Sequence, residues 1–283
     1  DCFLYVGDSG AQNWLALDHS QDFPIAANLT KLLEDKLDEL AGYLGTGRNL
    51  VSIGVGGGEK ERLILQQMVK KGRPKYWCVD VSSALVDAAV SAVEDMGIET
   101  TGVVSYMESL DELAKLWQEP IVLCILGNNF CNYEPESLLP MVREQLAEED
   151  VLRLDCHLME EDKAAQNAYE SQLNVKFNVE PLVRRGVSPD KYKFNIELIT
   201  VKSFIGQVYR TRKWLEMQDD VKFTVAGTPI HFERGETVEM GFTYKYRPEQ
   251  VDRILREEGF REIGRWLSDE RENMLILAEK VKE

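Results

Sequence analysis

A glycine-rich turn and a downstream acidic residue form the clearest chemical pattern in the chain. The turn Gly54–Gly58 reads GVGGG and comes directly after the apolar run Leu50–Ile53, and Asp80 ends the next apolar run, 22 residues beyond Gly58. Glycines permit a tight turn and let a bulky ligand approach the backbone. A carboxylate at the tip of the second strand can accept hydrogen bonds from both hydroxyls of a ribose. The pattern predicts a site for an adenosine-bearing cofactor, the alternative being a merely tight strand–helix turn.

The order of the glycines disfavours a nicotinamide dinucleotide. G-x-G-G-G lacks the final spacing of the dinucleotide fingerprint G-x-G-x-x-G. Glu59 follows where a helix would begin, and an acid at that place repels a pyrophosphate. S-adenosylmethionine has no phosphate and carries a positive sulfonium, so we expect it as the cofactor. Lys60 reads by default as a solvated helix residue, although it could meet the carboxylate of that cofactor.

Two other features lie at the ends of predicted strands. Asp80 could cap the start of the following helix instead of binding a ribose. A later apolar strand ends in LGNNFCNYEP, which places Asn128, Asn129 and Asn132 at the ligand crevice of a doubly wound sheet. Uncharged amides there are suited to orienting an amine or a carboxylate. The alternative is that these asparagines only form the turn before a helix.

The remaining reactive residues show no signature of metal binding or nucleophilic catalysis. His19, His157 and His231 are scattered, and no spacing of His, Cys or Asp indicates a metal site. No G-x-S-x-G elbow, P-loop or Cys–His signature is present in the sequence. The five cysteines lack CxxC spacing, and three of them lie in or beside apolar runs. This cysteine usage predicts buried thiols in a reducing compartment.

The composition narrows the class of partner. A length of 283 residues predicts one large domain or two modest ones. The net charge of −16 disfavours the phosphate-neutralising surface that nucleic-acid binding needs, so a small-molecule substrate is favoured. No run approaches the roughly 20 apolar residues of a membrane helix. We therefore expect a cytoplasmic protein that binds neither nucleic acid nor membrane.

Strands and helices alternate through the first half of the chain. A helix with apolar residues at three- and four-residue steps is expected to start at Asn28 as its N-cap. Near-continuous apolar strands such as IVLCIL predict a buried parallel sheet covered by helices. The expected elements are Asn49–Ile53, Glu59–Lys71, Tyr76–Val81, Ser83–Met96, Ile98–Val104, Leu110–Trp117, Pro120–Leu126, Pro135–Leu146 and Val151–Cys156.

The pattern changes after Asp162. Ala164–Leu173 reads as a helix, and long alternating runs between Tyr192 and Tyr246 predict antiparallel strands joined by turns. A helix over Pro248–Gly259 and a closing hairpin follow. The simplest architecture is an α/β core interrupted by a β-rich segment that forms a second domain.

Six motifs together carry a family resemblance. They are SIGVGGGEK at Ser52–Lys60, VDVSSALVDAA at Val79–Ala89, LGNNFCNYEP at Leu126–Pro135, AYES at Ala168–Ser171 followed by FN at Phe177–Asn178, NIEL at Asn195–Leu198 and YKYRPEQV at Tyr244–Val251. Over nearly its whole length the chain resembles the S-adenosylmethionine-dependent amino-acid N-methyltransferases, typified by the ergothioneine-pathway histidine Nα-methyltransferase. The resemblance implies an α/β fold with a Rossmann-like class I methyltransferase core at 27–158 and 247–283. It also implies an inserted β-rich substrate-binding domain at 1–26 and 159–246.

The same resemblance implies roles for individual residues. Asn132 matches a substrate-orienting asparagine, Tyr169 a tyrosine that binds the substrate carboxylate, and Tyr5 a tyrosine near the reacting centre. The residues implied to bind S-adenosylmethionine are Gly54, Gly56, Lys60, Asp80, Tyr106, Met107 and Asn128. The residues implied to bind the substrate are Asp22, Phe23, Asn132, Tyr169, Leu198, Gly241 and Thr243.

Departures from the family pattern bear on the substrate. Gly241 stands where the family has the glutamate that holds an imidazole, Thr243 replaces a serine, and Asp22 replaces a tyrosine. The expected reaction is therefore methyl transfer to the amino group of an amino-acid-like small molecule, with histidine itself disfavoured. The alternatives are an aminopropyl-type transfer that uses the same cofactor pocket, and a catalytically silent cofactor-binding protein. A nicotinamide oxidoreductase is less favoured.

Overall fold

The computed structural model describes residues 2–159 and 169–282. The chain divides into two compact units. The first, here called the core unit, comprises Ile25–Met159 and Lys245–Glu283. The second, here called the strand-rich unit, comprises Asp1–Pro24 and Glu160–Tyr244. The chain leaves the core unit after Met159 and enters it again at Lys245.

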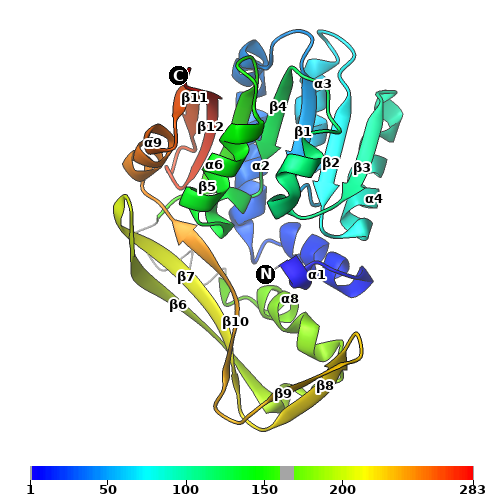
Figure 1. Cartoon of the computed structure of the whole chain (residues 1–283), viewed down its shortest axis with the longest axis vertical. Coiled ribbons are helices and arrows are strands. Elements are labelled where there is room, and N and C mark those ends of the chain that lie inside the picture. The colour runs from blue at the N-terminus through cyan, green and yellow to red at the C-terminus, as the bar shows by residue number, and fades with distance from the viewer. Residues whose placement is uncertain (1, 160–168, 283) are drawn as a thin grey trace. The chain divides into compact units, whose positions relative to one another are not determined.

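A seven-stranded sheet forms the centre of the core unit (Figure 1). Its strand order is β11–β12–β5–β4–β1–β2–β3, in which the strands from β5 to β3 run parallel and β12 and β11 add an antiparallel hairpin. The predicted parallel sheet and closing hairpin are both confirmed. The strands are β1 (Asn49–Ile53), β2 (Tyr76–Asp80), β3 (Thr100–Val104), β4 (Ile121–Ile125), β5 (Val151–His157), β11 (Phe260–Leu267) and β12 (Asn273–Lys280).

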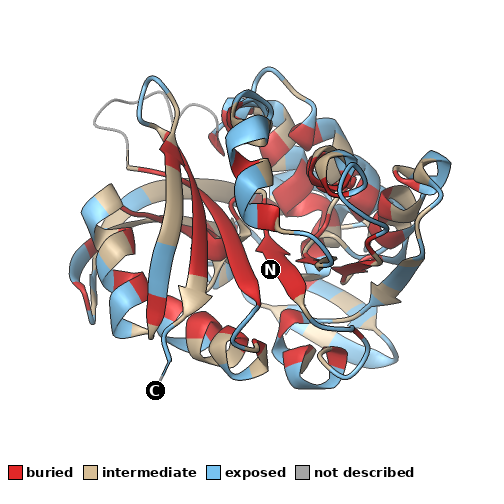
Figure 2. Ribbon diagram, turned by 90° about the horizontal axis from the view of Figure 1, so that it is seen from above, coloured by how far each residue is buried: buried red, intermediate tan, exposed pale blue. Residues whose placement is uncertain are grey.

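The central strands are buried because their sequences are almost continuously apolar. Every residue of β2, β4 and β5 is buried, as the red strands of Figure 2 show. Strands covered on both faces need apolar side chains at every position, which removes the alternation seen in half-exposed strands. All five cysteines are free, and the buried thiols predicted at Cys78, Cys124 and Cys156 are confirmed.

Helices flank this sheet in the core unit (Figure 1). α3 and α4 follow β1 and β2, as the βα rhythm of the sequence predicts. The helices are α2 (Pro24–Leu44), α3 (Glu59–Met68), α4 (Ser83–Ser91), α5 (Leu110–Leu113), α6 (Pro135–Gln145) and α9 (Pro248–Glu257), with the short 3₁₀ helices η2 (Glu94–Met96), η3 (Met107–Ser109) and η4 (Asn129–Asn132).

The start of α2 differs from the prediction. The helix begins at Pro24, so Asn28 lies inside it and the predicted N-cap is wrong. Proline suits a first helical position because its φ is already fixed and its missing N–H would have no partner there. Ile25 and Ala26 are buried, so the apolar face also extends one turn further than the leucine spacing indicated. A second helix boundary also differs from the prediction, because the helix predicted over Leu110–Trp117 ends at Leu113.

The strand-rich unit contains two small sheets (Figure 1). β7 lies between β10 and β6 in one sheet, and β8 pairs with β9 in the other. β6 and β7 are antiparallel, as are β8 and β9, which confirms the strands predicted from alternation. The helix predicted over Ala164–Leu173 lies largely outside the described residues. The strands are β6 (Tyr192–Ser203), β7 (Gly206–Met217), β8 (Val221–Val225), β9 (Thr228–Phe232) and β10 (Thr237–Lys245).

A polar contact fastens the first helix of the strand-rich unit to α8. The buried carboxylate of Glu180 accepts a hydrogen bond from Ser9 Oγ and another, of 3.1 Å, from Asn13 Nδ2. A buried carboxylate with two donors is stabilised relative to one left unpaired. The helical elements of this unit are η1 (Cys2–Leu4), α1 (Asp8–Asp18), α8 (Gln172–Val183) and η5 (Pro189–Lys191).

Candidate functional site

The glycine turn adopts a backbone that side chains would disfavour. Gly54 and Gly58 have φ values of 70° and 84°. A Cβ built on Gly58 would lie 2.8 Å from Cα of Ala89 in α4, which is too close for a real side chain. Gly54 N donates to Val79 O at 2.8 Å, so the turn remains attached to the neighbouring strand β2. The turn therefore brings bare backbone to the carboxyl end of β1, directly before α3 begins at Glu59.

Asp80 lies beside this turn and is only 6% exposed. Its carboxylate accepts Gly56 N at 3.2 Å and Ser82 N at 3.0 Å. The N-cap of α4 is Ser82, and no side chain caps this helix, so the capping role that was the alternative for Asp80 is not seen. A carboxylate offers about four acceptor positions, and the N–H group of Val81 takes a third, so one is left for a ligand hydroxyl. Burial raises the pKa of Asp80, while the N–H groups of Ser82 and Gly56 oppose that rise.

The loop after β4 is held by an aspartate that the sequence did not single out. Asp155 in β5 accepts Asn128 N at 2.7 Å and Gly127 N at 2.9 Å. The side chain of Asn128 in turn accepts His157 N at 2.8 Å, and Asn128 has a φ of 66°. Two backbone donors and one side-chain acceptor therefore fix this loop against β5. Burial raises the pKa of Asp155, and the N–H groups of Asn128 and Gly127 oppose the rise.

Asn129 connects the loop after β4 to the glycine turn. Its Nδ2 donates to Gly54 O at 2.9 Å and to Leu126 O at 2.8 Å. A side chain on Gly54 would collide with this amide. Asn129 was one of the three asparagines noted in the sequence, but it was not among the residues assigned to the cofactor. Its contacts show that the carboxyl ends of β1 and β4 form one connected backbone surface in the core unit.

Lys60 is not a solvated helix residue, so the default reading of the sequence is wrong at this position. Its side chain is 8% exposed. A Cβ built on Gly127 would lie 3.6 Å from Cε of Lys60, which places the aliphatic stem against the loop after β4. The positive charge of Lys60 lowers the pKa values of Asp155 and Glu61, opposing the larger effect of their burial. A buried ammonium at this point suits a ligand that carries a carboxylate.

The segment after β3 adjoins the same edge of the sheet. Ser105 N donates to Asp80 O at 3.0 Å, so the backbone that leads into Tyr106 is attached to the end of β2. Met107 is buried, whereas Tyr106 is 52% exposed. Asn132 is half-buried at the end of η4. Together with the hydrogen bonds described above, the Ser105 contact connects the segments that carry Gly54, Asp80 and Asn128 in the core unit.

Three aromatic candidates, Tyr5, Phe23 and Tyr169, lie in two clusters in the strand-rich unit. The rings of Phe23 and Tyr169 meet edge to face, with centroids 5.5 Å apart. Tyr5 packs against Trp14 at 5.3 Å and against Phe177 at 5.0 Å. Edge-to-face pairs restrain ring orientation, so both tyrosines are held in defined positions.

The other substrate candidates of the strand-rich unit differ widely in exposure. Thr243 in β10 is buried, Leu198 in β6 is 44% exposed, and Asp22 is exposed. Gly241 lies within β10 and has a φ of 150°, a value that favours glycine. Gly241 therefore has a backbone role and offers no side chain to a ligand.

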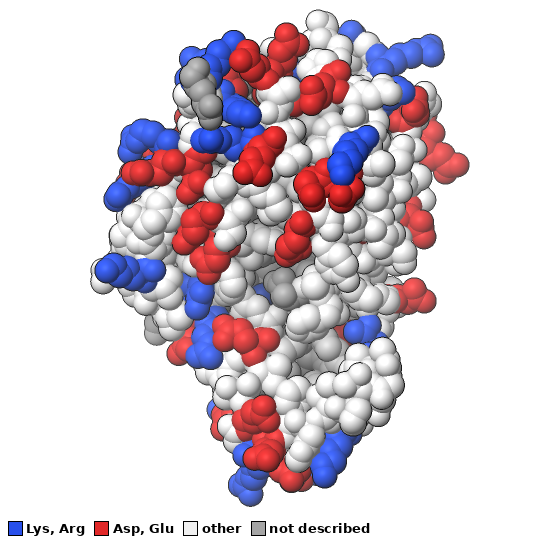
Figure 3. Space-filling model, in the orientation of Figure 1, with Lys and Arg blue, Asp and Glu red and all other residues white. Residues whose placement is uncertain are grey.

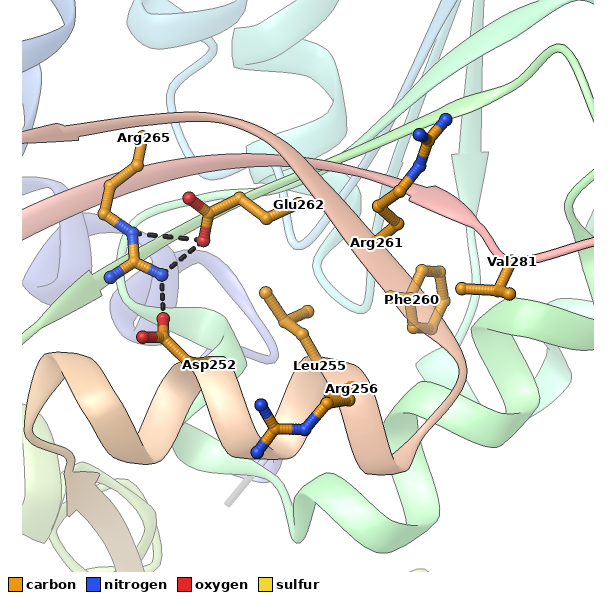
Figure 4. Close-up of a pocket in the computed structure, with 8 residues that line it drawn as sticks. All are labelled: Asp252, Leu255, Arg256, Phe260, Arg261, Glu262, Arg265 and Val281. Atoms are coloured by element: carbon orange, nitrogen blue, oxygen red, sulfur yellow. Dashed lines mark hydrogen bonds and ion pairs between the residues drawn. The ribbon is translucent and has the colours of Figure 1, made fainter.

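A groove of about 620 Å³ lies elsewhere on the core unit and contains none of the predicted residues (Figure 4). It runs between α9 and β11, where the guanidinium of Arg265 bridges Asp252 and Glu262. Leu255 and Phe260 supply an apolar floor. The arginine is already paired with two carboxylates, so the groove offers no evident chemistry.

On the face shown in Figure 3, lysine and arginine side chains are interspersed with aspartates and glutamates. Within 2–159 and 169–282, none of the helices combines the length and the apolar character needed to cross a bilayer.

Comparisons with known proteins identify the family and the fold of this chain. A model of the family described as histidine-specific, S-adenosylmethionine-dependent methyltransferases matches residues 2–280. The N-methyltransferase fsqC of Aspergillus fumigatus is 22% identical over 282 residues, covering 94% of this chain and 75% of that protein. Magnesium protoporphyrin IX methyltransferase from Synechocystis, solved with bound SAH, is 12% identical with a TM-score of 0.50, covering 98% and 96% of the two chains. CurJ carbon methyltransferase is 14% identical with a TM-score of 0.53, covering 98% of this chain and 59% of that one. The two structural likenesses support the fold alone.

Proposed function

This chain belongs to the histidine-specific, S-adenosylmethionine-dependent methyltransferase family, and we propose that its methyl acceptor is the amino group of an amino-acid-like small molecule other than histidine. The protein is an S-adenosylmethionine-dependent N-methyltransferase with the class I α/β fold. The observation that supports the methyl donor is the hydrogen-bonded network of Gly54, Asp80 and the loop after β4. The observation that supports methyl transfer to an amine is the family match over residues 2–280.

The residues of the core unit fit the methyl donor. Asp80 retains an acceptor position for a ribose hydroxyl, the Gly54–Gly58 turn exposes backbone, and Lys60 supplies a cation for the carboxylate of the donor. When bound, the donor would supply a methyl group on a positive sulfur. The lone pair of a neutral amine would bond to the methyl carbon as the carbon–sulfur bond breaks, leaving S-adenosylhomocysteine and a methylated ammonium that loses a proton to water. The protein contributes chiefly by positioning, because such a displacement requires alignment of the reacting atoms at about 3 Å.

Three residues are proposed to act on the acceptor. We assign Asn132 and Tyr169 to the carboxylate of the acceptor and Tyr5 to the orientation of its amine. An amide and a phenol can each donate a hydrogen bond to a carboxylate. No strong general base is required, since the amine can lose its proton to water before it binds.

The proposal that histidine is not the acceptor depends on β10. Gly241 has no side chain, so this position offers no carboxylate for an imidazole N–H. A buried imidazole without a hydrogen-bond partner costs about 1–3 kcal/mol. Because the family match covers residues 2–280 and the other departures, at Asp22 and Thr243, also lie among the proposed substrate residues, a change in the acceptor explains Gly241 more simply than a loss of activity.

The test is an assay with a panel of amino acids and S-adenosylmethionine carrying a labelled methyl group. We expect label on the amino nitrogen of at least one amino acid, located by tandem mass spectrometry, with histidine a poor acceptor. Label on oxygen or carbon, or histidine as the best acceptor, would contradict the proposal.

Asn132→Ala provides the variant for this assay. Loss of a hydrogen bond to a charged carboxylate costs about 1.5–3 kcal/mol, so KM for the acceptor should rise about 10-fold or more. Asn49→Ala is the matched control, because Asn49 lies at the amino end of β1 and donates to Gln118 O at 2.7 Å. An unchanged KM in Asn132→Ala would remove Asn132 from the site.

A further inference from the structure

A buried lysine lies in the central strand of the three-stranded sheet of the strand-rich unit, and within 2–159 and 169–282 no acidic side chain forms an ion pair with it. Lys213 in β7 is 7% exposed. Burial lowers its pKa to about 8, and among the described residues no charged neighbour contributes to that shift. Removing an ammonium group from water without an anion is costly, and lysines are rarely buried unless they are paired. The fold therefore maintains a cation here for which the described residues supply no anion.

The register of β6 and β7 defines what shares a face with Lys213. Lys213 lies opposite Ile196, and Thr211 lies opposite Leu198. Residues directly opposite in an antiparallel pair point to the same side, and residues two apart along a strand do so as well. Lys213, Thr211 and Leu198 therefore lie on one face. On it the lysine and the threonine are buried, and Leu198 is accessible.

The other face of β7 carries two arginines that contact β10. Arg212 donates to Glu239 at 3.1 Å, and the guanidinium of Arg210 lies 4.9 Å from the ring centroid of Phe242. These arginines point away from the Lys213 face, because side chains alternate along β7. Their charges are therefore on the opposite side of the strand from Lys213.

The shared face thus presents one ammonium, at Lys213, and one threonine hydroxyl, at Thr211. We propose that this face binds a carboxylate of the methyl acceptor, with Lys213 as its counter-ion. The inference rests on the proposed function, because it takes the strand-rich unit to bind the acceptor. Either the α-carboxylate or a side-chain carboxylate of an amino acid has the required chemistry.

The experiment compares the wild-type acceptor of highest kcat/KM with its amides. Each carboxylate of that acceptor is converted in turn to a primary amide, and kcat/KM is measured for wild type, Lys213→Met and Lys193→Met. Lys193 is the matched control, since it is an exposed lysine of β6 in the same sheet. Loss of a charge-assisted contact corresponds to a decrease of about 30-fold in kcat/KM, appearing mainly in KM.

The expected result is that Lys213→Met lowers kcat/KM for the parent acceptor and has little effect on the one amide that lacks the bound carboxylate. That amide identifies which carboxylate Lys213 binds, and wild type should discriminate against it by a similar factor. Lys193→Met should behave as wild type, and titration with S-adenosylhomocysteine should show that Lys213→Met still binds the core-unit ligand.

Two results would overturn the inference. Lys213→Met could lower kcat/KM for the parent and for every amide by one common factor, or wild type could accept every amide as well as the parent. Either result would leave the proposed function intact. If wild type methylates no amine at all, the proposed function fails and this inference fails with it.

Discussion

In the parallel sheet, the side formed by the amino ends of the strands is here called the amino edge, and the side formed by their carboxyl ends the carboxyl edge. At each of them a buried aspartate holds a loop. Asp150, just before β5, accepts Ile121 N at 2.7 Å and Ala147 N at 2.8 Å. Asp155, near the other end of β5, accepts Asn128 N at 2.7 Å and Gly127 N at 2.9 Å. Burial raises the pKa of both carboxyl groups. Each aspartate therefore fixes a neighbouring loop, and the chemistry of the contact does not distinguish the edges.

What distinguishes the edges is the backbone that the fixed loops leave bare. At the amino edge the side chain of Asn49 donates to Gln118 O and accepts Lys75 N at 2.9 Å. At the carboxyl edge the glycine turn leaves backbone bare beside Asp80. Binding capacity at the carboxyl edge is thus expected from bare backbone beside a fixed acid.

The largest expected effect is on cofactor binding by Asp80→Ala. This change removes the acceptor for a ribose hydroxyl and for Gly56 N. The dissociation constant for S-adenosylhomocysteine should rise about 100-fold, equivalent to about 2.7 kcal/mol, in a calorimetric titration. Asp150→Ala, at the amino edge, is the control and should bind as wild type does. Equal losses in the two variants would erase the difference between the edges.

Gly58→Ala is expected to have the next largest effect, on stability. Gly58 has a φ of 84°, and a Cβ there would lie 2.8 Å from a backbone atom of Ala89. The left-handed backbone costs about 1–2 kcal/mol for a residue with a Cβ, and the contact adds to this. Gly72→Ala, ahead of β2 at the amino edge, is the control because a Cβ there meets nothing within 4 Å. Urea unfolding midpoints would separate the two, and similar midpoints would refute the strain assigned to the turn.

Asp155→Asn and Asp150→Asn test the comparison most symmetrically. An amide has one oxygen to accept with and an NH₂ that repels the second N–H, so each variant should lose about 1–3 kcal/mol of stability. Only Asp155→Asn should also lower kcat/KM, by about 10-fold, because its loop carries Asn128 and leads to Asn132. If Asp150→Asn lowered kcat/KM as much, loop positioning at the carboxyl edge would not be the cause.

The smallest expected effect is a pH dependence of cofactor affinity. Burial raises the pKa of Asp80 in the free protein. A carboxylate that accepts a ribose hydroxyl binds in its ionised form, so binding lowers that pKa and releases a proton. Affinity for S-adenosylhomocysteine should therefore decrease as pH falls through the raised pKa and level off above it. Asp80→Asn should remove this slope, and Asp150→Asn should retain it.

The fold and the proximity of the glycine turn to Asp80 could be predicted because they depend on local sequence. The apolar strands, the glycine turn and Asp80 are all readable within short windows, and the parallel sheet follows from their order. Helix ends were less predictable: α2 starts at Pro24 because burial of Ile25 overrides the capping preference of Asn28.

Residues that act across the chain could not be predicted. Asp155 sits in the apolar run VLRLDCH, and its partners at Gly127 and Asn128 precede it by 28 and 27 residues. Lys60 looked solvated because its burial depends on the loop after β4. Lys213 lies in the alternating run RTRKWLE, so its side chain points to the same side as that of Thr211 and away from that of Arg212. That this side is buried depends on the tertiary structure and could not be read from the run.

Amide hydrogen exchange with and without saturating S-adenosylhomocysteine tests the difference between the edges most directly. We expect the ligand to slow exchange in peptides covering Gly54–Lys60, Asp80–Ser82 and Leu126–Asn132, all at the carboxyl edge. Peptides covering Gln118–Ile121 and Ala147–Asp150, at the amino edge, should exchange at unchanged rates. Slowing at the amino edge, or none at the carboxyl edge, would contradict the assignment of cofactor binding to the end of the sheet that carries the glycine turn.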